Sequence, residues 1–463
     1  MSTRKFDLNV EEILEDWEVH HAIREVIANA IDEKILSETK DVQIFKDSNN
    51  KWHIRDFGRG IRYEHLTQNE DEEKIRNPHV IGKFGIGLKD ALATFDRKGV
   101  GVTIKSQYGN ITLGRSQKHG FEDVITLHAY ISPPSEPALE GTDVILDGVT
   151  AADIEKAKDL FLVFSGERRI EETKYGEVLT RRSREPARIY INGLKVAEEE
   201  NFIFSYNITS LTKQIRQALN RERTNVGRSA YSYRVKSILL SCEGKEVADL
   251  LVTDLSNYAT GRMHDELSWI DVQEHAVKIL NAQEKVVFLT SEELMRATNM
   301  VDEARSSGYR IVTIPENLKE KIRGQADIHD GIIRDLGQFY KEYDESFEFK
   351  FVNLNKLSRA ERKVLRTTSK IFRLVGGKPS EIKKIQISET MRKDPGSFVE
   401  ANGLWDSANG RIIVKRSRLG NLSEYAGTLL HETAHATSGA SDVSRDFETA
   451  LTRLLGILAS HNL

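Results

Sequence analysis

The segment His431-Glu432-Thr433-Ala434-His435 lies near the C-terminal end of the 463-residue chain. In a helix, residues four positions apart lie on one face, so His431 and His435 can bind a single metal ion. Glu432 is rotated away from that face, where it can act as a general base on a water molecule. An amphipathic stretch, residues 423–430, leads into the segment, and Gly439 follows as a helix stop signal. The spacing therefore predicts a zinc-binding helix that ends near Gly439.

The third zinc ligand has to be sought among carboxylates, because no histidine follows His435 until His461. Glu448 borders an apolar helix face, where an unpaired carboxylate would be costly and a metal ion would offset its charge. Asp442 is the alternative ligand, although it is also a good N-cap for the last helix. We predict Glu448 as the third ligand and keep Asp442 as the alternative.

The composition describes an ordinary globular protein, with 39% hydrophobic and 30% charged residues. A net charge of −4 gives no general attraction to nucleic acid or to anionic membranes, so neither partner is indicated. The single cysteine, Cys242, excludes an internal disulfide and suits a reducing cytosol. No apolar run approaches the roughly 20 residues that span a bilayer. We therefore expect a cytoplasmic protein of two to four domains.

A polar stripe marks the first predicted helix, residues 11–37. Glu25, Asn29 and Asp32 lie at positions i, i+4 and i+7, on one side of this helix. A carboxylate and an amide stacked in this way suit a positioned water molecule and a hydrated Mg²⁺ ion. Charged stripes are more often solvated faces, so this signal needs support from other motifs.

Two glycine-rich motifs supply that support. Asp56-Phe57-Gly58-Arg59-Gly60 follows a predicted strand at 52–55, and a second motif over residues 81–92 contains Gly82, Gly85 and Gly87. In the second motif a glycine-rich turn opens a helix, so that backbone N–H groups can face phosphate oxygens. Neither a P-loop nor the order of a dinucleotide-binding fold is present.

The order of these motifs over residues 10–150 resembles the GHKL ATPases of the Bergerat fold, a group that includes type II topoisomerases, MutL and the ninety-kilodalton heat-shock chaperones. The resemblance implies that Glu25 is the base for ATP hydrolysis, that Asn29 binds Mg²⁺ and that Asp56 receives the adenine amino group. Residues 62–81 would form a mobile lid over the nucleotide. The remaining residues implied to surround the nucleotide are Gly58, Gly60, Gly82, Gly85, Gly87, Lys89 and, in the last motif, Gly141-Thr142.

A hairpin is predicted after this region, with strands on both sides of Asn192-Gly193. It resembles the start of the transducer domain that follows the ATPase domain in MutL and the topoisomerases. In that domain a basic residue reaches the γ-phosphate, and the candidates here are Arg221, Arg223 and Arg228, of which we take Arg223. These arginines are equally well explained as surface residues paired with Glu222 and its neighbours.

The rest of the chain divides into two parts. Strands at 285–290 and 310–315 on either side of a helix at 292–307 predict a small α/β segment with no catalytic residues. From about residue 349, a helix at 358–374, strands at 384–388, 403–406 and 411–415, and the metal helix follow in order. This order resembles a minimal zincin peptidase domain over residues 355–463, in which the edge strand binds the substrate backbone by strand addition.

Together the motifs predict a multidomain α+β protein with four segments. They are a GHKL ATPase domain of the Bergerat α/β sandwich type (1–150), a transducer-like α/β domain (151–245), an α/β coupling segment (246–348) and a zincin-like domain (349–463). The predicted function is an ATP-hydrolysing switch that regulates a zinc-dependent peptidase. Its cofactors would be ATP, Mg²⁺ and Zn²⁺, it would dimerise through the ATPase domain, and its substrate would be a protein.

Two alternatives belong to different classes. In the first, a chaperone-like or DNA-associated ATPase carries a zincin domain that is only structural. In the second, a peptidase uses the GHKL domain as an ATP sensor without turnover, although Glu25 argues against this. A regulated effector in stress or antiphage defence is one biological interpretation of the architecture.

Overall fold

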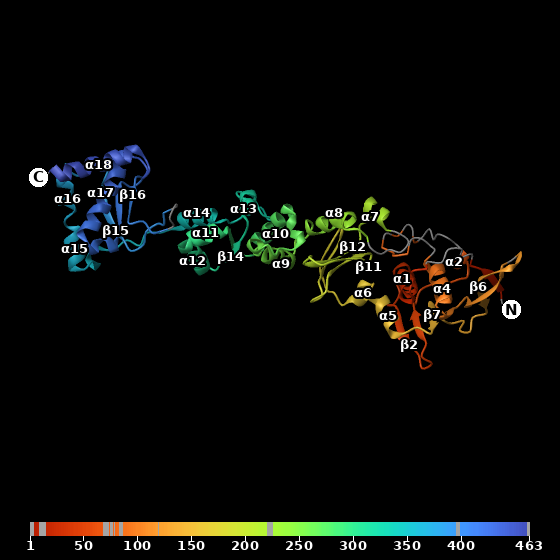
Figure 1. The fold of residues 1–463 in the computed structure, drawn as a ribbon. Coiled ribbons are helices and arrows are strands. Elements are labelled where there is room, and N and C mark those ends of the chain that lie inside the picture. Colours follow the sequence, from red (N-terminus) through yellow and green to blue (C-terminus); the bar gives the residue numbers. More distant parts are fainter. Residues whose placement is uncertain are drawn as a thin grey trace. The chain divides into compact units, whose positions relative to one another are not determined.

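The computed structural model shows a multidomain α+β protein built from two compact units, residues 1–280 and 281–463 (Figure 1). It describes residues 4–8, 15–67, 74, 77, 79–82, 87–118, 120–219, 226–394 and 399–460. Among these, no helix is long and apolar enough to cross a membrane. The four-segment division is finer than these two units and stays a prediction.

A seven-stranded sheet forms the first part of unit 1, and all its neighbouring strands are antiparallel, in the order β1-β6-β5-β4-β7-β3-β2. Along β4 the buried and less buried side chains alternate, as a strand with one face on the core requires. The strands are β1 (Arg4–Asp7), β2 (Gln43–Lys46), β3 (Trp52–Arg55), β4 (Gly101–Ser106), β5 (Gly109–Lys118), β6 (Phe121–Ser132) and β7 (Thr142–Asp147).

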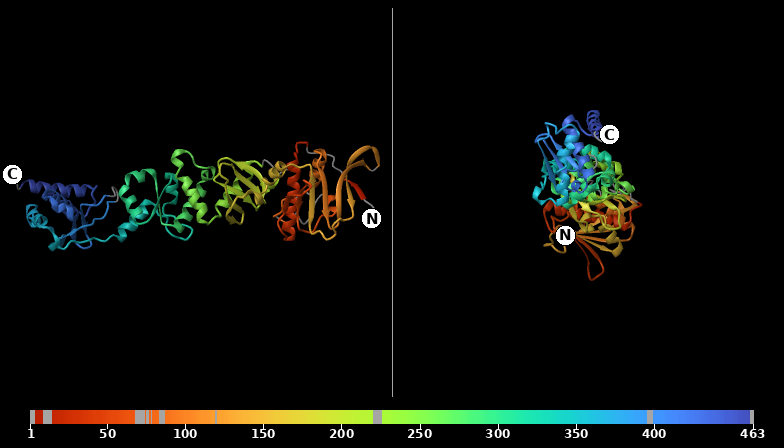
Figure 2. Two further views of the ribbon diagram at one scale, coloured as in Figure 1. Left: turned by 90° about the horizontal axis from the view of Figure 1, so that it is seen from below. Right: turned by 90° about the vertical axis from the view of Figure 1, so that its left-hand side faces the viewer.

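Helices pack on this sheet and share one apolar core with it. Figure 2 shows α1 (red) beside the strands of the sheet. These helices are α1 (Val19–Ser37), α2 (Glu64–Thr67), α4 (Gly87–Arg97) and α5 (Ala151–Lys158). The predicted start of α1 at residue 11 is wrong, because Glu18 is the N-cap and its N–H donates to Nδ1 of His21 at 3.0 Å. Residues 9–14 lie outside the described part of the chain.

A five-stranded sheet follows in the order β11-β10-β12-β9-β8, with β10 and β12 parallel and the other pairs antiparallel. The predicted hairpin is confirmed: β10 and β11 pair across Asn192 and Gly193, which both have positive φ, at 49° and 80°. The strands are β8 (Arg169–Thr173), β9 (Gly176–Thr180), β10 (Ala187–Ile191), β11 (Leu194–Glu199) and β12 (Phe204–Ile208).

The other helical elements up to residue 283 include one that carries a buried carboxylate. Oε1 of Glu266 accepts hydrogen bonds from the N–H groups of Ile203 (2.8 Å) and Phe204 (3.2 Å) and from the Tyr206 hydroxyl (3.1 Å), which fixes η2 against β12. The helical elements are α6 (Leu162–Ser165), α7 (Lys213–Ala218), α8 (Arg228–Leu239), α9 (Lys245–Leu255), η1 (Tyr258–Thr260), η2 (Asp265–Ser268) and α10 (Ile270–Gln283).

Unit 2 begins with two parallel strands, β13 (Val286–Leu289) and β14 (Arg310–Thr313), as the sequence predicts. The helices are α11 (Ser291–Arg296), α12 (Thr298–Ser306), α13 (Glu316–Ile322) and α14 (Leu336–Ser346). The helix predicted at 292–307 is therefore two helices, separated at Ala297. Both strands share one apolar core with residues of α11, α12 and α14.

The last part of unit 2 is a three-stranded sheet in the order β15-β17-β16, with β15 parallel and β16 antiparallel to β17. The three strands have the predicted bounds: β15 (Lys384–Ser388), β16 (Gly403–Asp406) and β17 (Arg411–Lys415). The other elements are η3 (Leu354–Lys356), α15 (Arg359–Leu365), α16 (Thr368–Leu374), η4 (Arg416–Gly420), α17 (Leu422–Ser438) and α18 (Arg445–Ser460). Because β16 lies at the edge of the sheet, one side of its backbone has no neighbouring strand among the described residues.

The helix predicted at 358–374 is wrong as a single element, because it is split into α15 and α16. The hydroxyls of Thr367 and Thr368 donate to the carbonyls of Val364 (2.6 Å) and Leu365 (2.5 Å). Such side-chain hydrogen bonds compete with the backbone hydrogen bonds of a helix. Where two of them occur at successive residues, they favour a break in the helix.

A close approach between two backbones leads to a first prediction. Gly141 has φ +79°, and a Cβ there would lie 2.1 Å from the carbonyl oxygen of Asp56. Gly148 has φ +89°, but a Cβ there would come no nearer to another atom than 3.8 Å. We expect Gly148→Ala to cost about 1–2 kcal/mol from backbone strain alone, and Gly141→Ala to cost more, because a backbone must also move. Calorimetric unfolding of both variants checks this, and equal melting temperatures would contradict it.

The buried Glu266 leads to a second prediction. Burial raises its pKa from 4.5 to about 7, and its Oε2 atom is buried without a hydrogen-bond partner among the described residues. A raised pKa means that the carboxyl stabilises the fold below about pH 4.5 and that this stability, about 3 kcal/mol, is lost as the pH rises through 7. We expect Glu266→Gln to remove this pH dependence.

Hydrogen exchange of β12 amides between pH 5 and pH 8, corrected for intrinsic rates, measures the effect. The exposed Glu200→Gln serves as the control and should behave as wild type. The same pH dependence in Glu266→Gln and wild type would show that the carboxyl of Glu266 does not titrate in this range.

Candidate functional site

Glu25, the predicted base, is buried on α1 beside the start of α4. Its Oε1 accepts hydrogen bonds from Nε (3.0 Å) and Nη2 (2.8 Å) of the adjacent Arg24, which is itself buried. The Arg24 guanidinium also lies 5.0 Å from the centre of the Trp17 ring. A Cβ on Gly87 would lie 2.1 Å from Oε2 of Glu25. The first residue of α4 therefore has to be glycine for this carboxylate to occupy its place.

The other two residues of the polar stripe contact the segments that follow. Oδ1 and Oδ2 of Asp32 accept the N–H groups of Ile81 (2.6 Å) and Gly82 (2.7 Å), which fixes the start of the second glycine-rich motif on α1. Oδ1 of Asn29 accepts Nζ of Lys74 at 3.0 Å. An ammonium group thus lies next to the amide predicted to hold Mg²⁺. Sequence reasoning missed Lys74, because no pattern marks a single lysine in a polar stretch.

Asp56 is buried where β3 ends and β7 begins. Its Oδ1 accepts the N–H groups of Gly58 (3.0 Å) and Thr142 (3.2 Å). Burial raises the pKa of Asp56 above its usual value, and these hydrogen bonds oppose the shift. The Thr142 hydroxyl accepts the N–H of Ile61, just beyond Gly60. The two motifs predicted to surround the nucleotide, at 56–60 and 141–142, are therefore side by side.

Of the other residues predicted to bind the nucleotide, some belong to the described part of the chain and some do not. Lys89 lies in the first turn of α4 and is half-buried. Gly85, Arg221 and Arg223 lie outside the described residues. Arg228, the third candidate arginine, opens α8, where Nη2 donates to Oδ2 of Asp265 at 2.6 Å and the guanidinium lies over the Phe202 ring.

The hairpin turn of the five-stranded sheet contacts the residue that precedes the second glycine-rich motif. Nδ2 of Asn192 donates to the carbonyl oxygen of Val80 at 3.2 Å, one residue before the segment that Asp32 holds. The sequence identifies Asn192 only as a turn residue, so this contact was not foreseen. It joins the second sheet to the second glycine-rich motif within unit 1.

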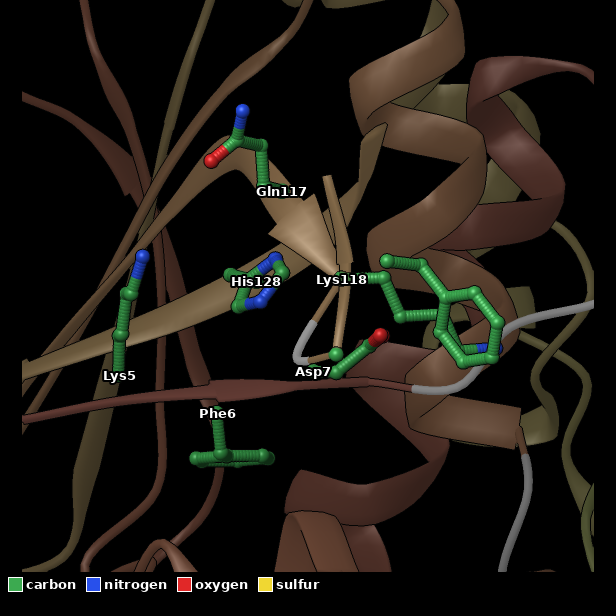
Figure 3. A pocket seen from close by; sticks show the side chains of 8 residues that line it. Lys5, Phe6, Asp7, Gln117, Lys118 and His128 are labelled. Carbon is green, nitrogen blue, oxygen red and sulfur yellow. The ribbon is translucent and has the colours of Figure 1, made fainter. Parts of the chain in front are cut away.

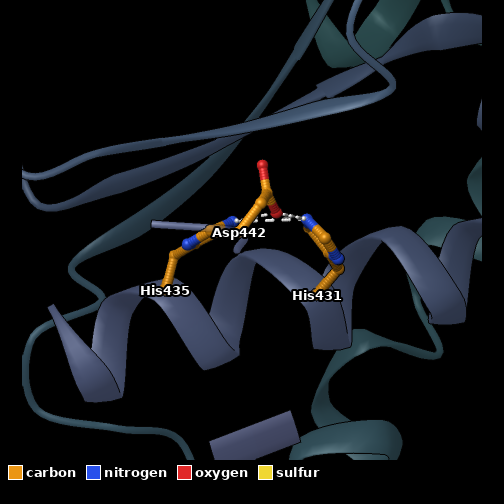
Figure 4. A group of neighbouring side chains, drawn as sticks. All are labelled: His431, His435 and Asp442. Atoms are coloured by element: carbon orange, nitrogen blue, oxygen red, sulfur yellow. Dashed lines mark hydrogen bonds and ion pairs between the residues drawn. The ribbon is translucent and has the colours of Figure 1, made fainter. Parts of the chain in front are cut away.

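A separate cluster lies in unit 2, where α17 presents His431 and His435 to one carboxylate (Figure 4). Oδ1 of Asp442 lies 2.9 Å from Nε2 of His431 and 3.0 Å from Nε2 of His435, and the two Nε2 atoms are 3.2 Å apart. As predicted, Gly439 ends α17, with φ 65°. One turn of regular helix is therefore enough to bring the two histidines together.

The cluster contains Asp442, the alternative in the sequence analysis, and not Glu448, which the sequence analysis preferred. Glu448 is exposed on the first turn of α18 and belongs to no such cluster among the described residues, so no buried charge needs a metal there. The cap of α18 is Ser444, whose hydroxyl accepts the N–H of Phe447 at 3.2 Å. Asp442 is thus free of the capping role that made it ambiguous in the sequence.

Glu432 is a buried residue of α17, and its side chain lies against the edge strand β16. A Cβ on Gly403 would lie 2.6 Å from its Oε1, and the N–H of Trp405 donates to its carboxylate. Burial, together with the Asp442 carboxylate, raises the pKa of Glu432 to about 8. The glutamate is therefore held close to both the metal-ligand cluster and the strand that would receive a substrate.

The three ligand atoms suit a zinc ion. Ligands about 2.0–2.1 Å from a tetrahedral zinc ion lie roughly 3.3 Å apart, and the three separations here are 2.9, 3.0 and 3.2 Å. The carbonyl oxygen of Ala440 lies 2.8 Å from Nδ1 of His435. With a proton on Nδ1, this contact is a hydrogen bond. The unprotonated Nε2 is then the atom that can bind a metal. Two neutral imidazoles and one carboxylate form a donor set typical of zinc.

A hollow of about 500 Å³ lies in unit 1, beside β1, β6 and the end of β5 (Figure 3). Its lining mixes basic, acidic and aromatic side chains: Lys5, Phe6, Asp7, Gln117, Lys118, Phe121 and His128, with Gly120. None of the residues predicted to bind nucleotide or metal lines it.

Residues 152–245 match the model of a protein family described as the Mycoplasma pneumoniae MPN635 N-terminal domain. This stretch contains the whole five-stranded sheet and α8. An uncharacterized protein of Mycoplasma pneumoniae (strain ATCC 29342 / M129) is 39% identical over 246 residues, which are 52% of this chain and 99% of that protein.

Two further uncharacterized proteins of the same organism are similar to the chain. One is 23% identical over 348 residues, covering 70% of this chain and 96% of the relative. The other is 28% identical over 153 residues, covering 32% and 79%. Because the chain spans nearly all of the relative to which it is 39% identical, it belongs to the same family as that Mycoplasma pneumoniae protein.

Proposed function

We propose that this chain is a GHKL-type ATPase whose nucleotide-driven conformational change regulates a zinc-dependent peptidase on the same polypeptide. The observation that carries the proposal is the convergence of His431, His435 and Asp442. Glu432, the next residue of the HExxH segment, is buried close to Asp442. Such a cluster next to a buried glutamate and an edge strand has the elements of a metallopeptidase.

In the peptidase half, His431, His435 and Asp442 would hold Zn²⁺. The ion would supply Lewis-acid chemistry, acidifying water and polarising a peptide carbonyl. Glu432 would accept a proton from the attacking water and pass it to the leaving amine. The edge of β16 would bind an extended protein substrate by backbone hydrogen bonds, which would place a peptide bond next to Glu432.

In the ATPase half, Asp56 would accept the adenine amino group and Asn29 would hold Mg²⁺. Glu25 would orient and deprotonate water, with Arg24 keeping its carboxylate in place. The N-terminal end of α4, beside Gly87, would face phosphate oxygens. Support comes from the arrangement in unit 1, where one stripe of α1 holds Glu25, Asn29 and Asp32 against the glycine-rich segments.

Nucleotide binding would close the lid and favour a homodimer through the ATPase domain, in the cytoplasm. The contact of Asn192 with Val80 supports a link from the nucleotide motif to the second sheet. A peptidase among cytoplasmic proteins needs restraint, and a two-state element biased by ATP supplies it.

A cleavage assay tests the function as a whole. We expect the wild-type chain to cleave casein at a rate that changes with Mg·ATP, and Glu432→Gln to lower cleavage about 10²-fold or more, because the base is lost. Glu25→Ala should still bind ATP but lose hydrolysis. Equal cleavage by wild type and Glu432→Gln would overturn the peptidase, and equal ATP turnover by wild type and Glu25→Ala would overturn the ATPase.

Nucleotide binding gives a prediction that does not depend on turnover. We expect Asp56→Asn to abolish ATP binding, because an amide presents a donor where the adenine amino group needs an acceptor. Isothermal titration with a non-hydrolysable ATP analogue and Mg²⁺ measures it. Asp143→Asn, a change of the same kind one residue after Thr142, is the control and should bind as wild type. Tight binding by Asp56→Asn would show that this carboxylate does not receive the base.

Zinc affinity separates the two carboxylates. We expect Asp442→Asn to weaken Zn²⁺ binding about tenfold or more, because a neutral amide replaces a charged ligand. The exposed Glu448→Gln should leave it unchanged. Competition with a chromogenic chelator gives both dissociation constants. If Glu448→Gln alone weakened Zn²⁺ binding, Glu448 would be the third zinc ligand, as the sequence analysis predicted.

A further inference from the structure

Phe447 contacts both candidate zinc-binding histidines. It is 5% exposed and lies near the start of α18, five residues after Asp442. Its ring is stacked on His435, with centroids 4.3 Å apart and planes at 25°, and it meets His431 edge-on at 4.9 Å and 67°. We propose that Phe447 is a positioning residue that keeps both imidazoles oriented with Nε2 toward Asp442. This inference rests on the proposed zinc site.

The two histidines need such a contact to different degrees. The Ala440 carbonyl fixes the position of Nδ1 in His435, but a ring held at one atom still tilts about that hydrogen bond. A flat ring stacked at van der Waals distance limits the tilt. The side chain of His431 is 40% exposed, and the edge of Phe447 covers part of its ring. One aromatic side chain thereby restrains both ligands.

Phe447 also connects the histidines to Asp442. Its N–H donates to the Ser444 hydroxyl, which caps α18, and that hydroxyl donates to the Ser441 carbonyl at 2.8 Å. The turn that carries Asp442 is therefore tied to the helix turn that carries Phe447. Contact of the Phe447 ring with α17 therefore also holds the Asp442 carboxylate opposite the two imidazoles. Loss of the ring would loosen all three ligands together.

The core of unit 2 provides a matched control. Phe372 belongs to the same apolar cluster and is 4% exposed, but it lies on α16 and no ring contact joins it to either histidine. Phe372→Leu and Phe447→Leu therefore remove the same atoms from equally buried positions of one core. A purely structural role would give both variants the same consequences for the metal site.

The experiment uses the full chain, stripped of metal with a chelator and titrated with Zn²⁺ and, separately, with Co²⁺. We expect Phe447→Leu to weaken Zn²⁺ binding about 10-fold or more, as changes around metal ligands commonly do. The visible absorption of bound Co²⁺, which reports ligand geometry, should lose intensity. Phe372→Leu should match wild type, and Phe447→Tyr, which keeps a flat ring, should recover affinity to within about threefold.

The outcomes separate this inference from the proposed function. Wild type without stoichiometric Zn²⁺ or Co²⁺ would overturn the metal site and the inference with it. Wild type that binds metal no better than Phe447→Leu would overturn the inference alone, as would equal losses in Phe447→Leu and Phe372→Leu. If circular dichroism shows that Phe447→Leu is misfolded, Phe447→Met is the second non-aromatic variant, judged by the same criteria.

Discussion

Buried carboxylates and the groups that must satisfy them determine the local structure of both candidate sites. A carboxylate removed from water needs hydrogen-bond donors, and here many of the donors are backbone N–H groups. Asp32 accepts hydrogen bonds from the N–H groups of Ile81 and Gly82. Asp56 binds the N–H groups of Gly58 and Thr142, and Glu432 binds that of Trp405. At two of these acids a neighbouring glycine leaves room for the carboxylate, because a Cβ would lie 2.8 Å from Oδ2 of Asp32 at Gly82 and 2.6 Å from Oε1 of Glu432 at Gly403.

The secondary structure follows from the sequence wherever local chemistry decides it. The Asn192-Gly193 turn needs positive φ at both positions, and Gly439 ends α17 in the left-handed conformation, so both were predictable. The predicted helix bounds were wrong where side chains form hydrogen bonds that compete with those of the helix backbone. Glu18 starts α1 later than the apolar periodicity suggests. The hydroxyls of Thr367 and Thr368 take helix carbonyls, and this divides a periodic stretch into two helices.

The candidate metal site was predictable to the extent that it lies on one helix. The spacing of His431 and His435 fixes their common face, whereas Asp442, the third member of the cluster, comes from a turn whose path depends on tertiary packing. Ser444 takes the capping role that the sequence offered equally to Asp442, and this releases the carboxylate toward the histidines. In unit 1, the pairing of β3 with β7 brings Asp56 to Thr142, a contact that no local pattern contains.

The two glutamates proposed as bases differ in the charges around them. Glu25 is paired with Arg24, so its charge is balanced by the protein itself. Glu432 is buried and has the carboxylate of the exposed Asp442 nearby instead. A divalent cation held by His431, His435 and Asp442 would lie close to Glu432 as well and would balance both carboxylates. Such a cation would supply in unit 2 the positive charge that Arg24 supplies to Glu25 in unit 1.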